Sequence, residues 1–389
     1  MSATTRRSLL GTGLRSVTTL GAMSLFKVAS ARGLDQAVLA INLIGGNDSN
    51  NMIVPLDAAA YETYARGRGE LAIPKSSLVT IVSSRQQTTY GLHPSLVELR
   101  GLYDRGALGI VANVGSLTSP LSRLQVLAQR GLPSDLMEHT SDSRWKFVHP
   151  GFAAPSWTAA LQQTVFGKEP FETFGFSSGL LVVPEERTKI EGSQMDNPRL
   201  LKAMTGGTPL RTVFPSTGLG KQLEQAAKLL QVGGSLGLGH PVFSTSLAGF
   251  DTHRDQLPKQ AELFTELSQA MAAFYEATRE LGIAERVTTY TDSEFNRALA
   301  PNAFHGSDHG WGGHQLVMGG GISGGDVFGA FPSLELGGAN DAGSHGVWIP
   351  AIANHQYQAT LAERYGLRPW DVAKLIPELR NFASPRLQL

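Results

Sequence analysis

The chain has 389 residues, of which 41% are hydrophobic and 17% are charged, and this composition is typical of a globular protein with one large or two ordinary domains. Its 33 basic residues balance 33 acidic ones and form no basic stripe with interleaved aromatic residues, so we expect no nucleic-acid partner. Cysteine is absent, which excludes disulfides, thiolate nucleophiles and thiolate-held metal centres and leaves oxygen and imidazole as metal ligands.

Residues 1–31 have the pattern of a twin-arginine signal peptide. The pair Arg6-Arg7 is followed by leucines, a weakly apolar stretch covers residues 11–26, and residues 29–31 are a small-x-small cleavage pattern. The alternative is an amphipathic N-terminal helix with an accidental arginine pair. No other apolar run approaches the about 18 residues that a membrane span needs. We therefore expect the twin-arginine machinery as an export partner, a periplasmic or secreted location and no stable membrane insertion.

Apolar patterns along the chain predict alternating strands and helices. Continuous apolar runs between turn residues predict buried strands, and apolar residues at helical spacing predict amphipathic helices. The predicted strands are residues 37–44, 109–114, 286–291 and 315–318, and the predicted helices are residues 96–103 and 257–281. This alternation predicts a doubly wound α/β sandwich.

Two segments do not fit the alternation. Residues 165–240 are rich in Gly, Thr, Ser and Pro and contain one helical patch near Gln222–Leu230, which favours an inserted cap or lid within a single domain of residues 32–389. The glycine-rich stretch Gly319–Gly325 lacks the lysine of a phosphate-binding loop and has no helix signal after it, so we predict a hairpin turn there.

Four polar clusters lie at the ends of predicted strands, where open α/β sheets bind ligands. Asp48 lies in the first cluster, Gly45–Asn51, and either ligates a hard cation or forms an Asx turn. In the second cluster, Asp251 and His253 reach one point if the segment is extended, and the alternative is that Asp251 or Thr252 caps the next helix.

The third and fourth clusters lie later in the chain. Glu294 is a candidate metal ligand or general base and Arg297 a candidate contact for an anionic substrate group, or the two form a plain surface ion pair. Asp308, His309 and His314 lie together in a glycine-rich frame that is unusual for a solvated loop. Together the four clusters suit an oxygen- and nitrogen-ligated site for two metals acting on a phosphoryl or sulfuryl ester.

Several of these motifs resemble the bacterial family called domain of unknown function 1501. The resemblance lies in Gly306–Gly325, Gly45–Pro55, Gly91–Pro94, Gly249–His253, and Trp348–Pro350 with Gln356-Tyr357. The family is placed in the alkaline phosphatase-like superfamily, which implies an α/β/α sandwich around a mostly parallel sheet, with two divalent metals and a hydroxyl nucleophile at the strand ends.

The resemblance implies a role for each matching position. Asp48 looks like the first metal aspartate, and Asp251 with His253 looks like the ligand pair after the middle strand. Glu294 stands at a carboxylate position, and Asp308 with His309 matches the late Asp-His pair.

The chain departs from the family in two of these places. Phe295 stands where the superfamily usually has histidine after the carboxylate. Family members often have Ser-His where this chain has Glu138-His139, so either Thr140 or Ser141 would have to serve as nucleophile or the chain has none.

Two functions follow from these residues. The first is an exported hydrolase that acts on a small-molecule or polymeric phosphate or sulfate ester with one or two divalent cations (Zn, Mn, Ca or Mg), in which Arg297 or His314 contacts the substrate. The second is a non-catalytic exported protein that binds a glycan, a surface component or a secreted partner. A nicotinamide or flavin enzyme is disfavoured because no Gly-x-Gly-x-x-Gly follows a strand.

Overall fold

The computed structural model describes residues 34–133, 136–139, 173–177, 180–182, 202–203, 205–319 and 321–389. The predicted signal peptide and the candidate nucleophiles Thr140 and Ser141 lie outside the described residues. Within the described ranges, none of the helices combines the length and the apolar character that a membrane span requires.

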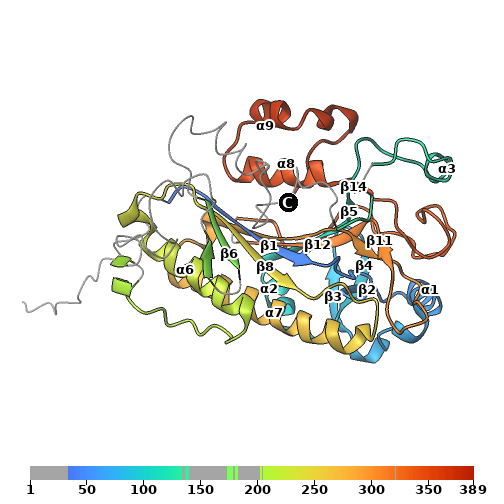
Figure 1. The fold of residues 1–389 in the computed structure, drawn as a ribbon, viewed down its shortest axis with the longest axis horizontal. Coiled ribbons are helices and arrows are strands. Elements are labelled where there is room, and N and C mark those ends of the chain that lie inside the picture. Colours follow the sequence, from blue (N-terminus) through green and yellow to red (C-terminus); the bar gives the residue numbers. More distant parts are fainter. Residues whose placement is uncertain are drawn as a thin grey trace, which may run out of the picture.

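A nine-stranded sheet forms the centre of the molecule (Figure 1). Its spatial order is β13 (Val327–Phe328), β5 (Leu108–Gly115), β12 (Gly313–Met318), β9 (Val287–Ser293), β1 (Ala37–Ile44), β8 (Val242–Ala248), β6 (Thr173–Ser177) and β7 (Leu180–Val182), and β14 (Ile352–Ala353) also pairs with β5. Among these described strands, β12 and β7 run opposite to the others. The sheet is therefore mostly parallel, which confirms the predicted fold class.

Both faces of the sheet are covered by helices, as expected of a continuous apolar strand such as β1. Leu39 and Ile41 of β1 belong to the core that includes residues of α2 (Val97–Asp104), α6 (Gly218–Leu236) and α7 (Gln256–Glu280). Val38 and Ala40 belong to the core of the opposite face, with α8 (Asn354–Arg364) and α9 (Pro369–Leu375). Figure 1 shows these two helical layers on either side of the sheet.

Smaller elements surround one end of the sheet. A three-stranded antiparallel sheet has the order β2 (Ile53–Pro55), β4 (Thr88–Leu92), β3 (Val79–Ser83), and β10 (Asn296–Arg297) pairs with β11 (His309–Gly310) as an antiparallel ribbon. Other described helices are α1 (Ala58–Arg68), α3 (Arg123–Leu127) and the 3₁₀ turns Gly69–Leu71, Lys75–Ser77, Ala284–Arg286 and Pro377–Asn381.

The six elements predicted from apolar patterns are all present, with ends that differ by at most two residues. The hairpin turn predicted for Gly319–Gly325 is wrong. Strands β12 and β13, which flank that segment, lie on opposite sides of β5 and do not pair with each other. The glycine-rich segment therefore crosses the end of β5, where a Cβ at Gly324 would lie 2.7 Å from the carbonyl oxygens of Gly106 and Leu108.

Described parts of residues 165–240 belong to the sandwich itself. Strand β6 pairs in parallel with β8, and α6 packs against α7 with buried residues that include Leu223 and Leu230. A cap or lid formed by the rest of this range stays a prediction, because those residues are largely outside the described ones.

Candidate metal centre

The carboxyl ends of β1, β8 and β9 meet at one edge of the sheet because the three strands are parallel neighbours, with Leu43 of β1 opposite both Leu247 and Ser293. The loops that follow these strands pack tightly together. Gly45 and Gly46 have φ angles of +110° and +82°, and a Cβ on Gly46 would lie 2.1 Å from the Phe295 ring. Glycine is needed here both for its backbone conformation and for the close approach.

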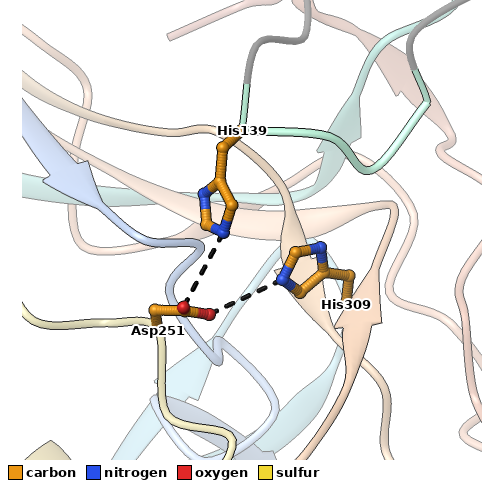
Figure 2. Close-up of side chains that lie close together, drawn as sticks. All are labelled: His139, Asp251 and His309. Carbon is orange, nitrogen blue, oxygen red and sulfur yellow. Dashed lines mark ion pairs between the residues drawn. The ribbon is translucent and has the colours of Figure 1, made fainter.

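Three side chains converge at this edge, with Asp251 from the loop after β8, His309 from β11 and His139 from residues 136–139. His139, Asp251 and His309 each place one potential ligand atom so that all three atoms lie within 4.8 Å of one another, and Figure 2 shows both rings turned toward the Asp251 carboxylate. His253 adds a third ring, with its Nε2 3.1 Å from Asp251 Oδ1. Asp251 is 48% exposed, so solvent and a small ligand can reach the cluster.

His309 presents an unprotonated nitrogen to Asp251. Its Nδ1 lies 2.7 Å from the carbonyl oxygen of Met137, and a carbonyl only accepts, so Nδ1 carries the hydrogen. In the neutral ring Nε2 then has a lone pair, 3.5 Å from Asp251 Oδ1. This Nε2 is buried and has no hydrogen-bond partner among the described residues. Two acceptors facing each other fit a cation between them.

The other two rings also lie between Asp251 and a second acceptor. His139 Nδ1 lies 2.7 Å from Glu294 Oε2, and its Nε2 lies 3.8 Å from Asp251 Oδ2. His253 Nδ1 lies 3.2 Å from Asp308 Oδ1. An imidazole that donates its Nδ1–H to a carboxylate or carbonyl and offers Nε2 is the usual state of a metal-binding histidine.

Charges around the cluster favour the protonation states that a cation needs. Burial acts to raise the pKa of Asp251, but the hydrogen bond and charge of Arg297, with His253 and His139, bring this pKa below its ordinary value. Burial lowers the pKa of His309, against the hydrogen bond to Met137, and positive neighbours lower it further. A hydrogen bond from Asn302 is the main cause of the lowered pKa of Asp308.

Asp48 is not brought into this cluster. Its carboxylate forms an ion pair with Arg68 and accepts from the Gln256 amide, and both partners of the ion pair are buried. Its Oδ1 also accepts from the Asn50 N–H at 3.0 Å, which is the Asx turn considered as the alternative. The charge of Asp48 is therefore balanced by protein.

Arg297 lies behind Asp251 with no exposed surface. Its guanidinium donates to Asp251 and to the carbonyl oxygens of Gly45, Gly46 and Ser307. These bonds hold three strand-end loops around the Asp251 carboxylate. The predicted Glu294–Arg297 surface pair is not formed, because Glu294 accepts from His139 and from the Gly45 N–H. Neither Asp251 nor Thr252 caps α7, whose N-cap residue is Asp255.

His314 lies apart from the cluster, in β12. It is 1% exposed, accepts from the Asn113 N–H through Nδ1, and stacks on Phe331. Its Nε2 and the Oδ1 of Asn47 are buried without partners in the described part of the chain. Both residues line a cavity of about 10 Å³ beside Glu294, which is room for one water molecule.

His139 is the site residue that the sequence analysis did not select. The one indication in the sequence was that relatives often have Ser-His at Glu138-His139. That position was used to look for a hydroxyl nucleophile, and the imidazole of His139 was not considered as a ligand. Nothing in the local pattern at Met137–His139 predicts contact with Asp251, because the two residues meet only through the tertiary fold.

Comparisons with known proteins agree with the sequence resemblance in part. Residues 196–347 match the family model described as "Protein of unknown function (DUF1501)". This DUF1501 segment carries Asp251, His253, Glu294, Asp308 and His309, and it does not include Asp48 or His139. No curated protein matches the sequence.

Three solved structures illustrate the structural likenesses. The lipoteichoic acid synthase LtaP from Listeria monocytogenes has a TM-score of 0.39 and 9% identity, over 87% of this chain and 74% of that one. Ps i-CgsB in complex with k-i-k-neocarrahexaose has a TM-score of 0.40 and 11% identity, over 90% and 77%. The soluble domain of lipooligosaccharide phosphoethanolamine transferase A from Neisseria meningitidis has a TM-score of 0.31 and 9% identity, over 73% and 77%. At these values the likenesses carry no conclusion about activity.

Proposed function

We propose that this protein is an exported, metal-dependent hydrolase that acts on phosphate or sulfate esters. The observation that carries the proposal is the convergence of His139, His253 and His309 on the exposed carboxylate of Asp251. A divalent cation held there would polarise an ester oxygen and stabilise the negative charge that develops during hydrolysis.

The chain's own residues supply the frame for this chemistry. Arg297 orients Asp251 from behind, and the β10–β11 ribbon fixes Arg297 opposite His309. Glu294 and the Met137 carbonyl orient the two imidazoles that face Asp251 in Figure 2. The predicted nucleophiles Thr140 and Ser141 directly follow His139 in the sequence, and they lie outside the described residues.

The experiment is turnover of nitrophenyl phosphate, bis-nitrophenyl phosphate and nitrophenyl sulfate by protein loaded in turn with Zn, Mn, Ca or Mg. We expect one ester to be hydrolysed, and activity to fall by more than about 100-fold in Asp251→Asn and His309→Ala, beyond the usual effect of losing an outer-shell partner. The matched controls Asp104→Asn and His345→Ala change exposed residues outside the cluster and retain activity. Full activity in Asp251→Asn would overturn the assignment.

A second function is favoured by the ion pair of Asp48. Because Arg68 balances this carboxylate, the described residues supply ligands for one cation and not for the two that the superfamily implies. A non-catalytic exported protein could keep such a site to bind a glycan or a protein partner. Stable metal binding without turnover of any of the three esters would favour this second function.

A further inference from the structure

We infer that the cluster around Asp251 takes one cation of the d-block type that prefers imidazole, such as Zn²⁺ or Co²⁺, and discriminates against Mg²⁺ and Ca²⁺. This inference rests on the proposed metal-dependent function and names the class and number of its cations.

The ligand atoms determine the class of cation. Ligand atoms of His139, His309 and Asp251 lie within 4.8 Å of one another, and Nε2 of His253 lies 3.1 Å from Asp251 Oδ1. Imidazole suits Zn²⁺, Cu²⁺, Ni²⁺ and Fe²⁺, whereas Mg²⁺ and Ca²⁺ take shells of oxygen ligands. The buried Nε2 of His309 lacks a donor among the described residues. A cation that accepts this lone pair would remove the cost of leaving it unsatisfied.

The nearby carboxylates are engaged as outer-shell partners. Glu294 accepts the Nδ1–H of His139 at 2.7 Å, and Asp308 lies 3.2 Å from Nδ1 of His253. In this arrangement their charges raise the basicity of the rings and fix the ring orientations, which strengthens binding to an imidazole-seeking metal. An oxygen-seeking cation would instead require these carboxylates to leave the histidines.

The number of cations follows from Asp48. Its carboxylate is paired with Arg68, whose Nη1 also donates to the carbonyl oxygens of Ala298 and Leu299 at 3.1 and 2.8 Å. The guanidinium is thus fixed in place by the segment that follows β10. A fixed protein cation at Asp48 leaves no uncompensated carboxylate there to hold a second metal.

The first test is metal content. Chelator-treated full-length protein is equilibrated with equal concentrations of Zn²⁺, Co²⁺, Mn²⁺, Mg²⁺ or Ca²⁺, and bound metal is measured by elemental analysis and calorimetry. We expect one equivalent of Zn²⁺ or Co²⁺, and at least 100-fold weaker binding of Mg²⁺ and Ca²⁺. Two equivalents of bound metal, tight Ca²⁺ or Mg²⁺ binding, or no Zn²⁺ or Co²⁺ binding would each overturn the inference.

The second test separates ligands from outer-shell partners. We expect His139→Ala and Asp251→Asn to abolish Zn²⁺ binding, and Glu294→Gln and Asp308→Asn to weaken it by about 10- to 100-fold while the stoichiometry stays at one. Asp104→Asn is the matched control for charge removal, and circular dichroism establishes that each variant is folded. Unchanged affinity in folded His139→Ala would remove that ring from the site.

The outcomes distinguish this inference from the proposed function. One bound Zn²⁺ without ester turnover supports the inference and contradicts the hydrolase. Ester turnover that depends on Ca²⁺ or on two cations supports the hydrolase and contradicts the inference.

Discussion

The role of Asp48 is determined by the residue with which it forms an ion pair. An aspartate after a buried strand is compatible with a metal ligand and with an Asx turn, and its local sequence does not separate the two. Arg68, at the end of α1, supplies the buried guanidinium that pairs with it. Burial lowers the pKa of Arg68 to about 9, because removing the charged guanidinium from water costs free energy.

We predict that Asp48→Asn destabilises the protein by about 3–5 kcal/mol, because Arg68 is left as an uncompensated buried charge. Unfolding by urea, followed by circular dichroism, measures the change. The matched control is Asp104→Asn, which breaks an exposed pair with Arg100 and should cost less than about 0.5 kcal/mol. Equal stabilities of the two variants would show that the Asp48 pair is not a structural element.

His314 is a buried histidine that the fold keeps neutral. Burial lowers its pKa to about 3, from 6.5 for the free side chain. Between these two values the unfolded chain binds a proton at this residue and the folded chain does not. Stability from this group is therefore complete above pH 6.5 and is lost as the pH falls toward 3.

We predict that His314 makes the free energy of unfolding fall by at most about 1.4 kcal/mol for each unit by which the pH is lowered. This contribution should be absent in His314→Gln, whose side chain can still accept from the Asn113 N–H. Urea unfolding at several values between pH 6.5 and pH 4 gives the slope for each protein. An identical pH dependence in wild type and variant would mean that His314 is protonated in the folded state.

At the scale of elements, the site depends on loops that touch each other. The segment after β8 carries Asp251 and His253, and the segment before β11 passes so close that Gly306 contacts the backbone of His253. Arg297 and His309 face each other across the β10–β11 ribbon. Long-range backbone contacts of this kind fix the rings more firmly than any of the loops could do alone.

We predict that Gly306→Ala weakens Zn²⁺ binding and costs about 1–3 kcal/mol of stability, because its Cβ would lie 2.2 Å from the carbonyl carbon of His253. Calorimetric titration and urea unfolding measure the two effects. Gly343→Ala is the control, since nothing lies within 4 Å of its Cβ, and we expect a change within about 0.5 kcal/mol. Normal Zn²⁺ affinity in Gly306→Ala would contradict the proposed role of this contact.

At the scale of the molecule, the sheet gathers segments that are far apart in the chain. Strand β1 lies between β8 and β9, which follow it by about 200 residues or more, and these neighbours place the second and third polar clusters beside the first. The helical layers in Figure 1 cover both faces and leave the strand ends as the place where polar side chains meet.

The twin-arginine signal predicted for residues 1–31 would act on the whole chain. We predict that the double substitution Arg6→Lys with Arg7→Lys prevents export, since the arginine pair is the feature that the twin-arginine machinery recognises. Fractionation of bacterial cells that express the full chain, followed by immunodetection, measures the location. The control Arg15→Lys changes a neighbouring arginine and should be exported normally. Export of the double variant would show that the N-terminus is not a twin-arginine signal.

The sequence by itself determined the fold class and the main elements. Apolar runs predicted β1, β5 and β9, and helical spacing predicted α2 and α7, because burial on one or both faces of an element leaves a periodic pattern in the chain. It also indicated that Asp251, His253, Glu294, Asp308 and His309 stand at strand ends. The sequence could not show which of these potential ligands lie close together, because contacts between distant residues leave no periodic pattern in the chain.

Only the tertiary structure decided how these residues are used. In the folded chain His139 lies beside Asp251, Asp48 forms an ion pair with Arg68, and Arg297 lies behind the Asp251 carboxylate. Each of these contacts joins segments that are distant in sequence. The hairpin prediction for Gly319–Gly325 failed for the same reason, because the pairing partner of each strand is set by packing across the whole sheet. Pairing of charges and lone pairs depends on distances of a few ångströms, and those distances exist only after the chain has folded.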